Sequence, residues 1–114
     1  MLNDVPLTVR IEGAKAIVDV EAENLDFRNA ELMKSKLAEI VKGGQTHVVL
    51  NLSKVNFMDS SGLSILLSGK RLTEEAGGSF GVCELQVYVN NLISLTNLNK
   101  TIAVFASDAE AAKG

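Results

Sequence analysis

The sequence predicts an α/β domain built on a mixed, mostly parallel sheet of about five strands with about four helices. Short apolar or alternating segments typical of strands recur along the chain, and segments with helical spacing of apolar residues follow most of them. Such alternation implies right-handed crossovers between parallel strands. The first two strands are joined by a short turn, which predicts one antiparallel pair at one side of the sheet.

The length and composition indicate one folded domain. The chain has 114 residues, which fits a single domain over residues 1–114. A chain of this length buries roughly two thirds of its unfolded surface, which is enough for one core. Hydrophobic residues make up 46% of the chain, and there is no Trp, one Tyr and four Phe. We therefore expect a folded domain with a largely aliphatic core.

Charge and cysteine content exclude several classes of protein. The net charge is −3 and no cluster of Lys and Arg occurs, which argues against a nucleic-acid partner. A single cysteine, Cys83, excludes an internal disulfide and fits a reducing compartment. No apolar run approaches the roughly 20 residues of a membrane span. Residues 1–6 lack the basic and apolar segments of a secretion signal, so we expect a cytoplasmic protein without direct membrane insertion.

The N-terminal part predicts a strand pair. Leu7, Val9 and Ile11 alternate with polar residues, as in a half-buried strand. Residues 12–15 read as a hairpin turn, and residues 16–20 as the second strand.

An amphipathic helix is predicted to follow this pair. Asp26 and Asn29 are candidate N-caps, because their side chains accept hydrogen bonds from the first backbone N–H groups. Gly43-Gly44 ends the helix. Apolar residues follow at helical spacing: Ala30, Met33, Leu37, Ile40 and Val41.

The C-terminal half alternates between strands and helices. The continuous apolar run His47–Leu52 predicts a central strand covered on both faces. A helix is predicted from about Ser60 to Ala76, and Gly77-Gly78 ends it. The remaining elements are a strand at Phe80–Cys83, a helix around residues 89–95, a strand at Ile102–Phe105, and a short helix that Ser107 or Asp108 caps and that runs through Ala112.

The helix that starts at Ser60 carries more leucines than one stripe can hold. Leu63, Leu66 and Leu67 are expected to face the sheet, which leaves Ile65 and Leu72 nearer a different face. Broad burial explains this pattern, and so does a partner-binding surface along one edge of the helix.

The most informative segment is Phe57-Met58-Asp59-Ser60-Ser61-Gly62-Leu63, which follows the strand Val48-Val49-Leu50-Asn51-Leu52. It reads as a buried strand, a loop, and a helix that opens with Asp59, Ser60 and Ser61. Unpaired backbone N–H groups favour negative charge at a helix start, so a phosphate on a hydroxyl there is tolerated. In the alternative interpretation, Asp59 and Ser60 only cap the helix.

The same residues resemble the signature of the STAS domain, a family named for sulphate transporters and anti-sigma-factor antagonists. The resemblance covers nearly the whole chain and includes Gly77-Gly78 and Leu95-Thr96-Asn97-Leu98, with Leu25-Asp26 upstream. Glu23 stands where the family has Gly, and Gln86-Val87 stands where a Ser-Pro often opens the third helix. The resemblance implies a STAS-like fold, phosphorylation at Ser60, and partner binding through Asp26, Asp59, Ser60, Ser61 and Gly62.

This resemblance implies an anti-sigma-factor antagonist controlled by phosphorylation. Its expected partners are an anti-sigma factor that is also a serine kinase, and a serine phosphatase. The unmodified protein would sequester the anti-sigma factor and so release a sigma factor. The alternatives are a non-switching STAS accessory subunit of a stress-signalling or lipid-transport assembly, and an enzyme.

The sequence offers no set of residues for catalysis, metal binding or cofactor binding. His47 has no Cys/His cluster beside it, as a metal site would need. Cys83 lies in a predicted buried strand and reads as a small core residue. Ser60 lacks the Gly-x-Ser-x-Gly context of a nucleophile. The glycine pairs lack the Lys-Ser/Thr of a phosphate-binding loop. We therefore expect a binding protein with no catalytic residues, metal or cofactor.

Overall fold

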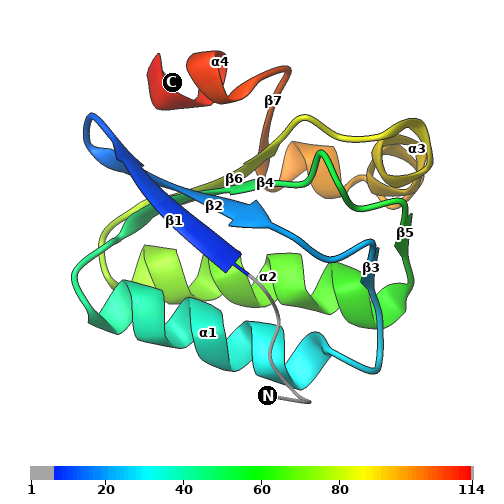
Figure 1. Ribbon diagram of the computed structural model, residues 1–114, viewed down its shortest axis with the longest axis horizontal. Helices are drawn as coiled ribbons and strands as arrows, with labels where there is room; N and C mark the ends of the chain where they lie inside the picture. Colours follow the sequence, from blue (N-terminus) through cyan, green and yellow to red (C-terminus); the bar gives the residue numbers. More distant parts are fainter. Residues whose placement is uncertain (1–6, 114) are drawn as a thin grey trace.

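A five-stranded sheet separates two layers of helices in the computed structural model, which describes residues 7–113 (Figure 1). Residues 1–6, whose sequence predicts no secretion signal, lie outside the described residues. The strand order is β1-β2-β4-β6-β7, with bounds Leu7–Glu12, Lys15–Val20, His47–Asn51, Ser79–Cys83 and Ala103–Phe105. The helices are α1 (Ala30–Lys42), α2 (Ser60–Glu75), α3 (Val87–Leu95) and α4 (Asp108–Lys113), with a 3-10 turn at Leu98–Lys100.

The predicted mixed sheet is confirmed. β1 and β2 are antiparallel, with Leu7 opposite Val20, and β2, β4, β6 and β7 are parallel neighbours. Val9 and Ile11 are exposed rather than half-buried, because β1 forms an edge of the sheet.

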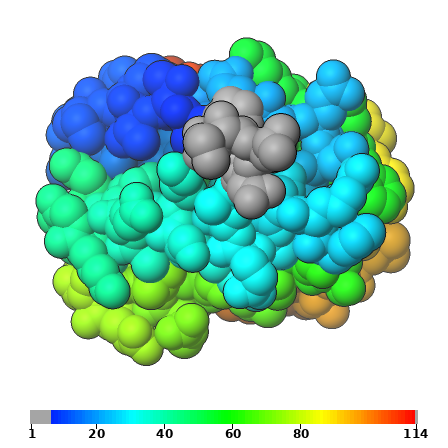
Figure 2. Space-filling view, turned by 60° about the horizontal axis from the view of Figure 1, so that its bottom comes forward, coloured from blue at the N-terminus to red at the C-terminus, as the bar shows by residue number. Residues whose placement is uncertain are grey.

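Both faces of the central strand β4 are covered, as its continuous apolar run predicts. Val48 and Leu50 belong to the main core, which α1 and α2 close from one side. Val49 points the other way, into a smaller cluster that includes Ala111 of α4. Figure 1 shows α1 and α2 beneath the sheet and α4 above it. In the space-filling view of Figure 2, α1 lies across the surface between β1 and α2.

The predicted orientation of α2 is only partly right. Leu66 is fully buried as expected, but Ile65 is also fully buried and Leu67 is 49% exposed. The buried face of α2 includes Gly62 and Gly69, which allow the helix to approach its neighbours closely. The buried face of α2 therefore differs from the face that the positions of the leucines predict. The pattern of apolar residues missed it because glycine is not counted as apolar.

A second, two-stranded sheet was not predicted. β3 (Asn24–Leu25) and β5 (Phe57–Met58) pair in parallel, with Leu25 opposite Met58. Two residues are too few to show alternation in a sequence. This small sheet holds two loops side by side, and both loops carry predicted site residues.

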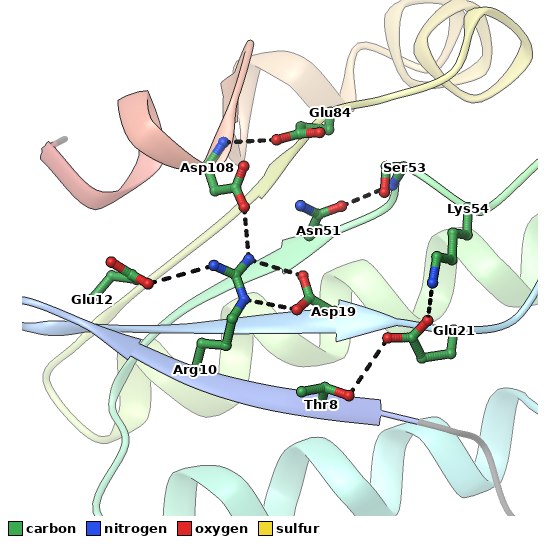
Figure 3. A network of polar contacts seen from close by, with 10 residues as sticks. All are labelled: Thr8, Arg10, Glu12, Asp19, Glu21, Asn51, Ser53, Lys54, Glu84 and Asp108. Carbon is green, nitrogen blue, oxygen red and sulfur yellow. Dashed lines mark hydrogen bonds and ion pairs between the residues drawn. The ribbon is translucent and has the colours of Figure 1, made fainter.

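A polar network joins β1 to the C-terminal helix (Figure 3). The Arg10 guanidinium donates to both carboxylate oxygens of Asp19, at 2.7 and 3.0 Å, and to Asp108 at 2.7 Å. These hydrogen bonds raise the pKa of Arg10 above its usual value. The Asp108 backbone N–H donates to Glu84 at 3.1 Å. Charged side chains on β1 and β2, together with Glu84 directly after β6, thereby fasten α4 over the sheet.

None of the helices in residues 7–113 is both long enough and apolar enough to cross a membrane.

Candidate functional site

Pairing between β3 and β5 brings the Asp26 and Asp59 loops together. Leu25 of β3 lies opposite Met58 of β5, so the next residue of each strand, Asp26 and Asp59, leaves the small sheet at the same end. The Asp59 backbone N–H also donates to the Leu25 carbonyl at 3.3 Å. Residues 33 positions apart in the sequence are thus neighbours at the start of α2.

The Asp59 carboxylate holds both loops. One oxygen accepts a hydrogen bond from the Gly62 N–H at 3.1 Å, which confirms Asp59 as the N-cap of α2. The other oxygen accepts from the Phe27 N–H at 3.3 Å. Capping therefore uses only half of this side chain, and the remaining oxygen fixes the loop that follows β3.

Two hydroxyl-bearing residues begin α2. Ser60 is its first residue and is exposed, whereas Ser61 is partly buried. Ser60 lies directly after the capping Asp59, where helix N–H groups lack intrahelical partners.

Asp26 is buried, with only 4% of its surface exposed, yet it is charged. Arg28 donates to it from Nη2 at 2.7 Å and from Nε at 3.2 Å to each oxygen, and its own backbone N–H donates at 3.0 Å. These bonds to the Arg28 side chain hold the pKa of Asp26 below its usual value. A carboxylate paired in this way stays ionised and fixes the turn after β3.

The predicted N-caps of α1 behave differently from expectation. Asn29 occupies the N-cap position, but its side chain makes no capping hydrogen bond. It accepts from the Asp26 N–H at 3.0 Å and donates to the Asn24 carbonyl at 2.8 Å. Asp26 does not cap α1, because it lies three residues before the N-cap position, and its carboxylate accepts from Arg28 instead. Both side chains therefore stabilise the β3–α1 loop.

Aromatic side chains flank this site, and the sequence reasoning missed them. Phe57 and Tyr88 stack with ring centroids 5.5 Å apart, and both are exposed. Phe27 is 74% exposed beside Asp59. We call Phe27, Phe57 and Tyr88 the aromatic surface. They are three of the five aromatic residues in the chain. The available signal in the sequence was that aromatic residues are rare and that two of them, Phe27 and Phe57, stand within two residues of Asp26 and Asp59. Nothing in the sequence places Tyr88 beside them.

The other residues considered from sequence lie away from this site. Cys83 is fully buried in β6, and burial raises the pKa of its thiol to about 12. The Nδ1 atom of His47 lies 2.9 Å from the Ser79 hydroxyl. Among residues 7–113, no group of three or more His, Cys, Asp or Glu side chains is arranged to hold a metal ion.

The fold and the Asp-Ser-Ser-Gly helix start define a known class of domain. The STAS domain model matches residues 6–111, so this chain belongs to the STAS domain family. It is 27% identical over 107 residues to the anti-sigma F factor antagonist of Paenibacillus polymyxa, with 92% of each chain covered.

Solved structures have the same fold. An anti-sigma factor antagonist from Mycobacterium paratuberculosis superposes with a TM-score of 0.84 at 24% identity, covering 99% of this chain and 95% of that one. The Bacillus cell fate determinant SpoIIAA in its phosphorylated form superposes with a TM-score of 0.67 at 17% identity, covering 91% and 95%. These likenesses confirm the predicted STAS fold.

Proposed function

We propose that this protein is an anti-sigma-factor antagonist that acts as a phosphorylation-controlled switch. In this proposal the unmodified protein binds an anti-sigma factor that is also a serine kinase, and a sigma factor is released. The kinase phosphorylates Ser60, binding weakens, and a serine phosphatase restores the first state. The protein works in the cytoplasm as a binding partner and carries out no catalysis itself.

The observation that carries this proposal is that Ser60, the first residue of α2, is exposed. A kinase needs a hydroxyl that it can reach, and the neighbouring Asp59 holds the loop that presents it. The relative in Paenibacillus polymyxa is named an anti-sigma F factor antagonist, and SpoIIAA has been solved in a phosphorylated form. Both names support the same role for this chain.

The proposed partner-binding residues fall into two groups according to how much of each residue is exposed to solvent. Ser60 is exposed, and Asp59 and Ser61 are partly exposed, so these three contact the partner. Asp26 and Gly62 are buried and act by shaping the surface. The aromatic surface supplies apolar contacts around them, since exposed aromatic rings are frequent anchors at interfaces.

A phosphate on Ser60 would oppose binding for a simple reason. Phosphoserine carries roughly −1.5 to −2 charges at neutral pH, and burying it in an interface costs desolvation energy. A loss of about 3 kcal/mol in binding free energy lowers affinity more than a hundredfold. Stabilisation of α2 by the same phosphate acts on free and bound protein alike, so it does not cancel this loss.

The test compares wild type, Ser60→Ala and Ser60→Asp against an anti-sigma factor kinase encoded near the gene, and Ser61→Ala is the control for the position of the phosphate. Calorimetry should show tight binding by wild type and Ser60→Ala, and weaker binding by Ser60→Asp. Mass spectrometry after ATP treatment should show one added phosphate on wild type and Ser61→Ala only. A phosphate on Ser60→Ala would place the site elsewhere, and a wild type that binds but gains no phosphate would indicate a non-switching accessory subunit.

A further inference from the structure

Arg28 carries an exposed guanidinium group that keeps unused hydrogen-bond donors although it is paired with Asp26. Its side chain is 64% exposed although it is paired with the buried carboxylate of Asp26. The hydrogen bonds to Asp26 come from Nε and Nη2. A guanidinium group has five N–H donors in a planar fork. Donors therefore remain for a second anion beside Asp26.

The position of Arg28 places this cation near the start of α2. The preceding residue, Phe27, is hydrogen-bonded through its backbone N–H to the carboxylate of Asp59. The hydrogen bonds to Asp26 are the main cause that raises the pKa of Arg28, and the Asp59 carboxylate adds a smaller attraction to the same guanidinium. Ser60 is the next residue after Asp59, and it is exposed.

Charge balance makes a second anion at this place depend on Arg28. The carboxylates of Asp26 and Asp59 already give the surface two negative charges near one guanidinium group. A phosphate on Ser60 adds roughly −1.5 to −2 more charges. Arginine binds phosphate through short, charge-assisted and frequently bidentate hydrogen bonds, which are about twice as strong as neutral ones.

We propose that Arg28 is the counter-ion of phosphorylated Ser60 and links the phosphate to the Asp26 loop. This inference rests on the proposed function, because it takes Ser60 as the modified residue. On phosphorylation, the Arg28 guanidinium is shared between Asp26 and the phosphate. The conformation of the β3–α1 loop, which carries the exposed Phe27, then changes together with the charge at the start of α2. Phosphorylation therefore alters the partner-binding surface in two segments.

The test uses protein in which phosphoserine is incorporated at position 60 during synthesis, so no kinase is needed. Phosphorus NMR then follows the second ionisation of this phosphoserine, which is near pH 6 in an unperturbed residue. A nearby guanidinium stabilises the dianion, so its pKa should be lower in the wild-type background than in Arg28→Gln, by roughly half a unit or more. Arg28→Lys should give an intermediate value, because it keeps the charge but loses the fork.

Arg71→Gln is the matched control. Arg71 has a similarly exposed side chain, at 62%, and its partner Glu75 lies in the last turn of α2. Removing it deletes the same charge at the far end of the helix and should leave the phosphoserine pKa unchanged. A second readout is the Nε–H signal of Arg28 in proton–nitrogen spectra, which should shift on phosphorylation while the Arg71 signal does not.

Equal phosphoserine pKa values in wild type and Arg28→Gln, or an Arg28 signal unmoved by phosphorylation, would overturn the inference. Neither result would argue against the proposed function, because that proposal is tested by the kinase experiment. Conversely, a kinase that never modifies Ser60 would remove the proposed function while this measurement still gives its answer. If Arg28→Gln fails to fold because Asp26 is left unpaired, Arg28→Lys and the Nε–H signal still decide.

Discussion

Gly62 lies directly against the backbone of Leu25. A Cβ atom added to Gly62 would stand 2.4 Å from the Leu25 carbonyl oxygen and 2.3 Å from Cγ of Met58. Neither distance allows a carbon atom, so the first turn of α2 packs on β3 and β5 only because residue 62 has no side chain. The glycine of the Asp-Ser-Ser-Gly motif therefore sets the distance between Ser60 and the Asp26 loop.

We predict that Gly62→Ala lowers the free energy of unfolding by about 1–3 kcal/mol, the usual cost of an overpacked core position. Urea denaturation measures this loss. The added methyl group must push α2 away from β3, so amide signals of residues 24–28 should shift most in proton–nitrogen spectra. Unchanged stability together with unchanged signals at Leu25 would contradict the close contact.

Leu66 and Leu67 form a matched pair on α2. Leu66 is fully buried and Leu67 is 49% exposed. Leu66→Ala should lower the free energy of unfolding by about 2–5 kcal/mol, because it leaves a cavity. Leu67→Ala should cost less than about 1 kcal/mol, as is usual at the surface. Chemical denaturation of both variants checks the face of α2, and equal losses would show that the assigned face is wrong.

The ion pair between Asp26 and Arg28 should make stability sensitive to acid. Arg28 holds the pKa of Asp26 below its usual value, so the folded state favours the carboxylate. The resulting stabilisation is complete above the unfolded pKa of about 3.9 and is lost as the pH falls through the lower folded value. Stability measured against pH for wild type and Asp26→Asn should therefore converge in acid. A constant difference down to the lowest pH would rule out this contribution.

The thiol of Cys83 should be unreactive in the folded protein. Burial, aided by nearby carboxylates, raises its pKa to about 12, so almost no thiolate exists at pH 8. Alkylation followed by mass spectrometry should be slow in native buffer and fast in denaturant. Rapid modification of the native protein would show that β6 opens locally.

Tyr88 is expected to matter for binding rather than folding. It is exposed and stacks on Phe57 beside the start of α2. Tyr88→Ala should lower affinity for the proposed kinase partner by about tenfold or more, as loss of an interface anchor does. Val104→Ala, an exposed apolar residue on β7, is the control and should leave affinity unchanged. Equal affinities for both variants would exclude Tyr88 from the interface.

Sequence patterns predicted most of the fold because they report burial over several residues. The continuous run in β4 predicted coverage on both faces, and Val48 and Val49 do contribute to different clusters. The same reasoning failed where structure depends on few residues or on missing side chains. β3 and β5 have two residues each, and the buried face of α2 is set in part by Gly62 and Gly69.

The candidate site was predicted through its motif but not through its geometry. Asp59 was recognised as a cap, and its second bond, to Phe27, depends on a pairing between β3 and β5 that no local pattern shows. The role of Arg28 was missed for the same reason. Its significance comes from the burial of Asp26, which sequence spacing does not report.

The hydrogen bond between Arg10 and Asp108 spans 98 positions of the chain. During synthesis, β1 leaves the ribosome long before α4 does. Arg10 can therefore pair with Asp19, nine residues away, well before Asp108 has been synthesised. The face of the sheet beneath α4 therefore stays open until translation of this domain is nearly complete. Until α4 closes over it, this face leaves the apolar side chains of Ile17 and Val49 uncovered, and uncovered apolar surface favours aggregation.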